Sequence, residues 1–205
     1  MQDLVLIITF GILTGCMLGL SWFAGSDAPF VPTKNERIKK ILRSAGLIKR
    51  EVFWELGSGD GRVVIEAAKM GAISYGIEQS LIRVLYSRWR ARKLKNTYFI
   101  HGDLFSFLQP AVIHLRGGRL VSHRQNTSEV DIRKADVVFI FLLPKGVEKL
   151  EPILKNTLKK GARAITQTFH FKNWKPYKKV LISDKTANTL LGKNKYEGDF
   201  WIYQV

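Results

Sequence analysis

One short stretch of the sequence combines residue types and spacings that could do chemistry. It reads Glu55-Leu56-Gly57-Ser58-Gly59-Asp60-Gly61-Arg62 and lies between an apolar run typical of a buried strand and a helical pattern. Glycines allow the backbone to turn tightly and to approach a ligand closely. The amides at the start of the following helix favour negative charge. The stretch therefore predicts a ligand-binding loop.

The spacing of the glycines separates three classes of ligand that use such a loop. A phosphate-binding P-loop needs Gly-Lys-Ser/Thr, whereas Gly61 is followed by Arg62. A dinucleotide fingerprint needs glycine at its sixth position, which is Arg62 here. Gly57, Gly59 and Gly61, with Glu55 two residues before the first of them, match the pattern of S-adenosylmethionine (SAM) sites. We therefore predict SAM as the ligand.

Two further acids follow the next two predicted strands. Glu78 ends the second strand, 23 residues after Glu55, where a carboxylate accepts from ribose hydroxyls. Asp103, next to Leu104, follows the third strand and could accept from an adenine amino group. The carboxyl ends of parallel strands form the ligand-binding edge of open α/β sheets. The predicted cofactor site thus contains Glu55, Gly57, Ser58, Gly59, Asp60, Gly61, Glu78, Asp103 and Leu104; the alternative is a solvated turn with unrelated acids.

Strands alternate with helices along the part of the chain that must position these residues. The predicted strands are Val52–Leu56, Ile73–Glu78, Thr97–His101, Ala135–Leu143, Ala162–Phe169, Lys179–Ile182 and Phe200–Gln204. The predicted helices are Arg62–Met70, Leu81–Lys95 and Gly146–Leu158. This alternation predicts an α/β fold with a mostly parallel sheet and helices on both faces. The last strands follow without an intervening helix, which predicts an antiparallel hairpin at one edge.

Two segments fall outside this alternation. Thr33-Lys34-Asn35-Glu36 forms a capping-box pattern, with Thr33 as N-cap and Glu36 reaching back, before a short amphipathic helix. Residues 106–128 are predicted to be an insertion, in which Gly-Gly between two alternating runs indicates a hairpin. We therefore divide the chain into residues 1–27, a pre-core segment at 28–50, and a catalytic domain at 51–205.

Composition and charge exclude some classes of protein. Hydrophobic residues make up 46% of the 205 residues, which fits a packed domain rather than a disordered chain. A single cysteine excludes a disulfide framework and a cysteine-based zinc site, and we predict no metal site. The net charge of +16 indicates an anionic partner such as nucleic acid, a membrane surface or an acidic protein.

The N-terminal segment carries none of the positive charge. Residues 1–33 contain no Lys or Arg and two acids, Asp3 and Asp27. The rest of the chain therefore has all 33 basic residues against 15 acidic ones, a net charge of +18. Leu4–Phe23 is uncharged and, as a helix, would span roughly 30 Å, the thickness of the hydrocarbon core. We predict a single-pass transmembrane anchor with the catalytic domain on the cytoplasmic or organelle-matrix side. A signal peptide and a lipoprotein signal ending at Cys16 are alternatives, both lacking a basic start.

Three glycines spaced four residues apart, Gly11, Gly15 and Gly19, fall on one side of this predicted helix. Such a row is typical of helix packing in membranes, so it could support self-association. Glycine is also common in membrane helices in general, and that alternative stays open.

From about Pro29 to Val205, apart from the insertion, the sequence resembles the seven-strand SAM-dependent protein lysine methyltransferases. This family includes broad-specificity archaeal enzymes and mitochondrial enzymes that act on the ATP synthase c-subunit and the adenine nucleotide translocase. Ala28–Thr33 resembles its "PYVPT" segment, with Phe30 in place of tyrosine, and Glu55–Arg62 matches "DLGxGDGR". Phe141-Leu142-Leu143 before a long helix, and Phe169 with Asn173–Pro176, resemble two further motifs.

The resemblance implies a Rossmann-like seven-stranded sheet, SAM as the methyl donor, and transfer to lysines of proteins, including membrane proteins. It also implies that Thr33 contacts the cofactor. Phe141, Phe169 and Trp174 are candidates for the substrate site, where aromatic rings could hold a cation, although core packing is the alternative for each. We assign no general base.

Three other functions stay open. The basic helix predicted over Leu81–Lys95 could face RNA, which would make the protein an RNA methyltransferase. The usual Asn/Asp-Pro-Pro motif that receives a base amino group is absent, because Phe141-Leu142-Leu143-Pro144 stands in its place. Methylation of a small molecule or lipid headgroup, and a non-enzymatic SAM sensor, are the remaining alternatives.

Overall fold

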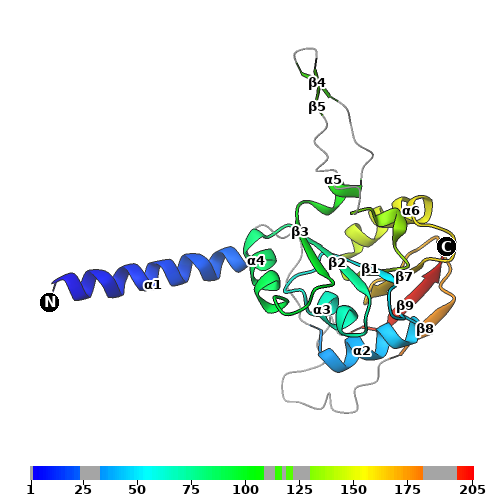
Figure 1. Cartoon of the computed structure of the whole chain (residues 1–205), viewed down its shortest axis with the longest axis horizontal. Helices are drawn as coiled ribbons and strands as arrows, with labels where there is room; N and C mark the ends of the chain where they lie inside the picture. Colours follow the sequence, from blue (N-terminus) through cyan, green and yellow to red (C-terminus); the bar gives the residue numbers. More distant parts are fainter. Residues whose placement is uncertain (1, 24–32, 109–113, 117–118, 122–129, 182–197) are drawn as a thin grey trace.

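Seven strands form one sheet in the order β3-β2-β1-β6-β7-β9-β8 (Figure 1). The computed structural model describes residues 2–23, 33–108, 114–116, 119–121, 130–181 and 198–205. The strands are β1 Val52–Leu56, β2 Ile73–Glu78, β3 Thr97–His101, β6 Val137–Ile140, β7 Arg163–Gln167, β8 Lys178–Val180 and β9 Phe200–Gln204.

The sheet is parallel through β3, β2, β1, β6 and β7. Strand β9 pairs antiparallel with β7, and β8 pairs antiparallel with β9. The predicted α/β sheet with an antiparallel edge is therefore confirmed. Because the five parallel strands run in the same direction, their carboxyl ends lie at one edge, where the predicted site residues follow them.

Helices cover both faces of the sheet. On one face lie α2 (Asn35–Ser44), α3 (Arg62–Lys69) and α4 (Leu81–Arg90); on the other lie α5 (Leu104–Leu108) and α6 (Pro144–Thr157) (Figure 1). Side chains alternate between the faces, as β1 illustrates. Phe53 packs with the residues of α2 and α3, whereas Trp54 packs with those of α6. Both faces of the sheet are therefore buried, as in other parallel sheets.

Several elements are shorter than the sequence predicts. Strand β6 is limited to Val137–Ile140, since a 3₁₀ turn at Ile132–Lys134 precedes it and the chain leaves the sheet after Ile140. Helix α6 then begins at Pro144, a residue that suits the first turn because it has no N–H to leave unpaired. Helix α4 ends at Arg90 rather than Lys95.

The capping box predicted before α2 is wrong. Lys34 is the N-cap residue, and it forms no side-chain cap hydrogen bond. The Thr33 hydroxyl instead donates to Gln167 Oε1 at 3.0 Å, and Glu36 pairs with Lys39. Thr33 and Gln167 are both buried, so each supplies the partner that the other cannot obtain from water.

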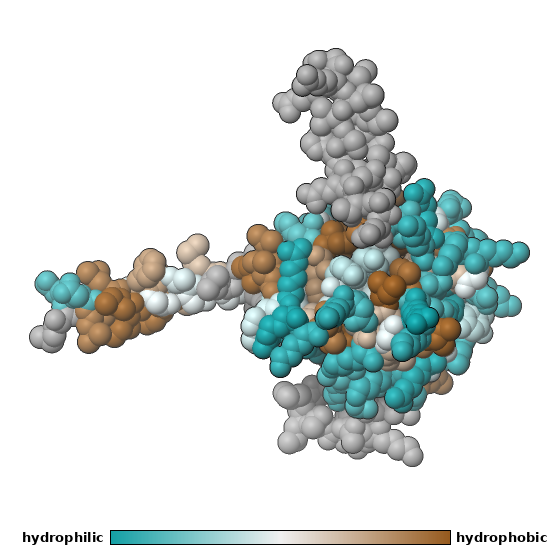
Figure 2. Space-filling model, viewed as in Figure 1, coloured by the Kyte–Doolittle hydropathy of each residue, from teal (hydrophilic) through white to brown (hydrophobic). Residues whose placement is uncertain are grey.

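The N-terminal segment forms a helix, α1, over Gln2–Phe23. Its described apolar side chains between Leu4 and Met17 are exposed (Figure 2), and its end contacts α4. Among the helices of the described residues, none is long and apolar enough to cross a membrane, so the structure does not support the predicted transmembrane anchor. A side chain added at Gly11, Gly15 or Gly19 would meet no atom within 4 Å, and self-association through them stays a prediction.

The hairpin predicted within residues 106–128 is confirmed. Strands β4 (His114–Arg116) and β5 (Arg119–Val121) pair antiparallel. The other predicted parts of this insertion, at 109–113, 117–118 and 122–129, lie outside the described residues, as does the motif at 28–32.

Candidate functional site

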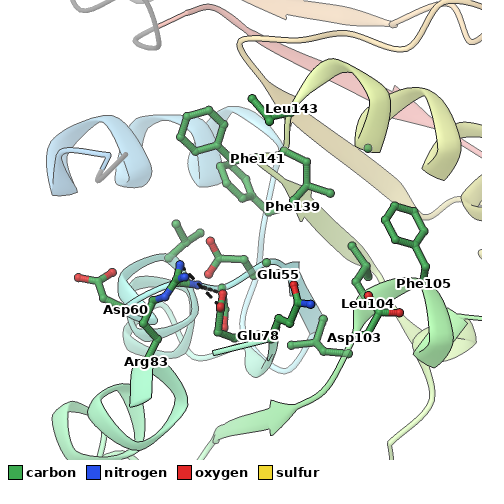
Figure 3. A pocket seen from close by; sticks show the side chains of 18 of the residues that line it. Glu55, Asp60, Glu78, Arg83, Asp103, Leu104, Phe105, Phe139, Phe141 and Leu143 are labelled. Carbon is green, nitrogen blue, oxygen red and sulfur yellow. Dashed lines mark hydrogen bonds and ion pairs between the residues drawn. The ribbon is translucent and has the colours of Figure 1, made fainter. Parts of the chain in front are cut away.

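A cavity of about 750 Å³ opens at the carboxyl ends of the parallel strands (Figure 3). The predicted site residues that line it are Thr33, Glu55, Gly57, Ser58, Gly59, Asp60, Glu78, Asp103, Leu104, Phe141 and Phe169. Two predicted residues, Gly61 and Trp174, are not among its lining residues. The structure thus brings together residues from the start of α2 and from the ends of five strands.

The glycine loop is held tightly against β2. The amides of Gly57 and Ser58 both donate to the carbonyl of Ile77, at 3.0 and 2.9 Å. Gly57 and Gly61 have left-handed backbones, with φ of +83° and +74°. Gly61 packs beneath the loop, where an added side chain would come within 2.6 Å of Phe99. This packing explains why Gly61 is needed although it does not face the cavity.

Glu78 ties the loop to the strand that follows it. Its Oε2 accepts from the amide of Gly59 at 2.9 Å, and its Oε1 accepts from the amide of Ser80 at 2.9 Å. The Arg83 guanidinium lies 3.7 Å from Oε1. A carboxylate offers about four lone-pair positions, so Glu78 can still accept from ligand hydroxyls.

Glu55 differs from the other acids of the cavity. It is buried, and among the described residues its Oε2 has no hydrogen-bond partner. Burial, with repulsion from Asp60 and Glu78, raises the pKa of Glu55 well above its usual value. A cation placed in the cavity would relieve this cost. SAM carries an ammonium and a sulfonium group, so the orphaned carboxylate fits this cofactor.

Asp60 joins the loop to the pre-core segment. Its carboxylate pairs with Arg62 and with Arg90, each at 2.7 Å. Arg62 also donates to the carbonyl of Thr33 at 3.0 Å. Asp60 therefore acts mainly by holding two arginines that fix the loop and the beginning of α2.

Asp103 lies at the start of α5. Its carboxylate accepts from the amide of Ser106 at 2.7 Å. Partial burial raises the pKa of Asp103, but the hydrogen bonds from Ser106 and Phe105 and the charge of Lys149 lower it further, so its pKa lies below the usual range. The group stays ionised and retains acceptor positions for a ligand amine.

The wall opposite the loop is apolar. Phe139, Phe141 and Leu143 come from the end of β6 (Figure 3). Leu142 lies between the last two, and Phe169 follows β7. A reacting amine at this wall would exchange part of its contact with water for contact with apolar side chains. Such desolvation favours the neutral form of a lysine.

Hydrogen bonds fix the segment that carries Phe169. Thr168 has a left-handed backbone, with φ of +66°, which turns the chain out of β7. Beyond Phe169, the buried Glu151 accepts from the amides of Lys172 and Asn173 at 2.9 and 2.7 Å. Trp174 stacks on Phe171, with ring centroids 5.4 Å apart, in the core. The structure thus gives Trp174 a packing position, whereas Phe169 faces the cavity.

Several lining residues were not predicted from the sequence: Arg62, Gln79, Arg83, Phe105, Phe139, Lys145 and Lys149. Arg83 had a signal, because an arginine among apolar residues of a helix needs a buried partner, which here is Glu78. Lys145 and Lys149 also had a signal in the sequence, since residues four apart share a helix face. The described residues contain no group of three or more His, Cys, Asp or Glu that could hold a metal.

Comparisons with known proteins agree with this geometry. The profile of the family described as histone methylation protein DOT1 matches residues 21–195. A protein-lysine N-methyltransferase of Saccharolobus islandicus (strain REY15A) is 29% identical over 160 residues, which cover 78% of this chain and 88% of that protein. A lysine N-methyltransferase of Mus musculus, named for the c-subunit of ATP synthase, is 30% identical over 148 residues, covering 72% of this chain and 51% of that protein.

A solved structure has the same fold and contains a cofactor-type ligand. It is described as an RNA methyltransferase of Salinibacter ruber in complex with S-adenosyl-L-homocysteine. It is 27% identical to this chain, with a TM-score of 0.64, and the match covers 85% of this chain and 94% of that one. The chain thus spans most of two of these three proteins and about half of the mouse protein.

Proposed function

Because this chain belongs to the family of the histone methylation protein DOT1 and is a SAM-dependent methyltransferase, we propose that it transfers methyl groups to lysine side chains of proteins. The observation that carries the proposal is the apolar wall of Phe141, Leu142, Leu143 and Phe169 opposite the acid-lined glycine loop. The side chains of this wall offer no hydrogen-bond acceptor to a base amino group. The names of the relatives from Saccharolobus islandicus and Mus musculus support the same substrate class.

The residues of the cavity would hold the cofactor in three places. Glu55 would accept from its ammonium group, Glu78 from its ribose hydroxyls, and Asp103 from its adenine amine. When bound, SAM supplies an electrophilic methyl group. The task of this chain is then to align the acceptor nitrogen with that group, since orientation provides much of the rate enhancement in such displacements.

The acceptor lysine must also lose its proton, because its ordinary pKa is about 10.4. The apolar wall favours the neutral amine by desolvation. Phe141 and Phe169 can hold the ammonium form by cation–π contact before the proton leaves. The proton can pass to solvent water before the neutral amine reaches the wall, so we assign no dedicated general base.

Transfer of label from tritiated SAM to a cell extract tests the proposed activity. We expect label in protein that protease removes and RNase does not, and mass spectrometry should place it on lysine. Glu78→Ala and Gly59→Arg should abolish both SAM binding, measured by calorimetry, and labelling. Glu148→Ala, which removes an exposed carboxylate of α6, should change neither. Protein label on residues other than lysine would contradict the substrate proposal.

RNA methylation is the second candidate, because the structural relative from Salinibacter ruber is described as an RNA methyltransferase. RNase-sensitive label in the same experiment would favour it. Label extracted with lipids or small molecules would favour methylation of those substrates instead.

We further propose that α1 attaches the protein to a membrane, with the catalytic domain on the cytoplasmic or organelle-matrix side. The exposed apolar side chains of α1 and the restriction of all basic residues to the chain after residue 33 support this proposal. Retention of the protein in membranes after alkaline extraction tests attachment. Protection of a C-terminal tag from external protease tests the orientation.

A further inference from the structure

One side of α4 exposes large apolar side chains. Leu81, Leu85, Tyr86 and Trp89 are between 40% and 59% exposed. Their spacing of four, one and three residues places them on one side of the helix, while Val84 and Ser87 are buried, and the Ser87 hydroxyl donates to the carbonyl of Gly59. The rings of Tyr86 and Trp89 are stacked, with centroids 5.9 Å apart. We call these four exposed residues the α4 face.

Positive charge surrounds the α4 face. Four basic side chains on α4 and just after it are exposed: Arg88, Arg92, Lys93 and Lys95. The Arg92 guanidinium lies over the Trp89 ring, 4.9 Å from its centroid. The sequence contains no Asp or Glu between Glu78 and Asp103, so no carboxylate from this stretch neutralises these cations. The α4 face is therefore apolar, aromatic and cationic at once.

A second exposed apolar surface adjoins it. Helix α1 contacts α4 and extends away from the domain at this side (Figure 1). The hydrophobic side chains of α1 and those at the adjoining edge of the domain lie on the same side of the molecule (Figure 2). Whatever binds the apolar side chains of α1 thus lies within reach of α4.

We propose that the α4 face docks on an anionic lipid bilayer. In this position Trp89 and Tyr86 would lie at the headgroup level, where amphipathic rings are favoured, and Leu81 and Leu85 would reach the acyl boundary. Arg88, Arg92 and Lys93 would contact lipid phosphates. RNA could bind the cations and the aromatic rings of the α4 face, but it would make no use of the exposed leucines. It would also not explain the exposed apolar side chains of α1.

The docking also places the cavity near the lipid surface. Leu81 follows Gln79, a lining residue of the cavity, by two positions. The cavity would therefore lie close to lysines of proteins at the membrane surface. This consequence rests on the proposed function, whereas the docking itself can be measured without any methyl transfer.

Flotation of the full-length protein with phospholipid vesicles tests the docking. The vesicles contain phosphatidylcholine alone or with about 30 mol% phosphatidylserine. We expect the wild type to bind the anionic vesicles more tightly. Leu85→Glu and Trp89→Glu should each weaken that binding by about tenfold or more, since each places a charge in the interface. Arg92→Gln and Lys93→Gln should each weaken it about fivefold, and only on anionic vesicles.

Matched control variants stand elsewhere on the surface. Ile48→Glu alters a side chain that is 64% exposed in the turn after α2, and Lys160→Gln alters an exposed lysine after α6. Neither should change vesicle binding. Retained affinity for S-adenosyl-L-homocysteine shows that each variant is folded, and methylation of a soluble peptide reports the proposed activity separately.

Three results would overturn the inference. The first is wild-type-like vesicle binding by the folded α4 variants, which would leave α1 as the sole attachment. The second is equal loss in Ile48→Glu or Lys160→Gln. The third is loss of affinity for a single-stranded RNA oligonucleotide in the α4 variants with unchanged vesicle binding, which would make the α4 face an RNA surface.

Discussion

At the scale of single residues, the cavity holds three neighbouring buried carboxylates in three different ways. Asp60 is paired with two arginines, and Glu78 accepts from two backbone amides. Among the described residues, the Oε2 atom of Glu55 has no hydrogen-bond partner. The protein thus stabilises two of the charges itself, whereas burial raises the pKa of Glu55, and a ligand cation would compensate its charge.

Glu55→Gln should separate the effect of this carboxylate on stability from its effect on cofactor binding. Because the folded-state pKa of Glu55 is raised above its usual value of 4.5, the folded state binds the proton more tightly than the unfolded state does. The contribution of Glu55 to stability is therefore present at low pH and is lost as pH rises from about 4.5 through the raised pKa. We expect the ligand-free variant to be more stable than wild type at neutral pH, with a flatter dependence of stability on pH.

Glu55→Gln should have the opposite effect on cofactor binding, which it should weaken. A bound ammonium lowers the pKa of Glu55, so binding releases a proton at pH values that lie between the pKa of the bound state and the raised pKa of the free state. Calorimetry in buffers of different ionisation enthalpy should detect this release in wild type and not in Glu55→Gln. The variant should bind SAM about tenfold or more weakly, as expected when a buried charged partner is lost. Equal proton release in both proteins would contradict the role given to Glu55.

At the scale of elements, the glycine loop depends on backbone conformation as much as on side chains. Gly61→Ala and Gly161→Ala form a matched pair, because both glycines have left-handed backbones, with φ of +74° and +84°. A side chain at position 161 meets nothing within 4 Å, whereas one at position 61 collides with Phe99 and Ser87. We expect Gly161→Ala to cost about 1–2 kcal/mol in free energy of unfolding.

Gly61→Ala should cost about 1–3 kcal/mol more, since overpacking adds to the backbone strain. It should also weaken SAM binding, because the loop must move away from Phe99, while Gly161→Ala should bind SAM normally. Urea unfolding and calorimetry measure both quantities. Similar losses in the two variants would show that backbone strain alone explains Gly61.

The segment after β7 provides a second test at this scale. Glu151→Ala removes the acceptor of two amides that fix the chain beyond Phe169. We expect kcat/KM for the protein substrate to fall about tenfold to a hundredfold, because small displacements at the acceptor wall are costly. SAM affinity should stay within about twofold, since the lost hydrogen bonds lie on the acceptor side. Asn156→Ala, at an exposed position of the same helix, is the control, and a parallel loss of SAM affinity would argue against a positioning role.

The same elements explain what the sequence could predict. Strands and the glycine loop follow from local patterns, so the sequence predicts the sheet correctly, and most of the residues that it assigns to the cofactor line the cavity. The partners that fix them are distant in sequence and left no local signal. Gln167, which binds Thr33, is 134 residues away, and Arg90 is 30 residues from Asp60. The capping box failed for this reason, because a tertiary hydrogen bond replaced a local one.

At the scale of the whole molecule, nearly every layer of the domain contributes residues to the lining of the cavity. Thr33 precedes α2, Glu55 and Glu78 end β1 and β2, and Phe169 follows β7. A ligand that contacts all of these links α2 and the glycine loop on one face to α6 on the other. We therefore expect cofactor binding to stabilise the domain as one cooperative unit rather than to order a single loop.

Thermal unfolding with S-adenosyl-L-homocysteine tests this coupling. At a ligand concentration of 100 times Kd, the free energy of unfolding should rise by about 2.7 kcal/mol. For a chain of this size, that gain raises Tm by about 5–10 °C. Gly161→Ala should lower Tm with and without ligand and keep the same rise, whereas Gly59→Arg should lose the rise.

Far-UV circular dichroism, which follows the sheet and helices, and near-UV signals from the buried aromatic residues should shift together, because one folding unit has one midpoint. Two separated midpoints in the presence of ligand would show that the cofactor stabilises only part of the domain.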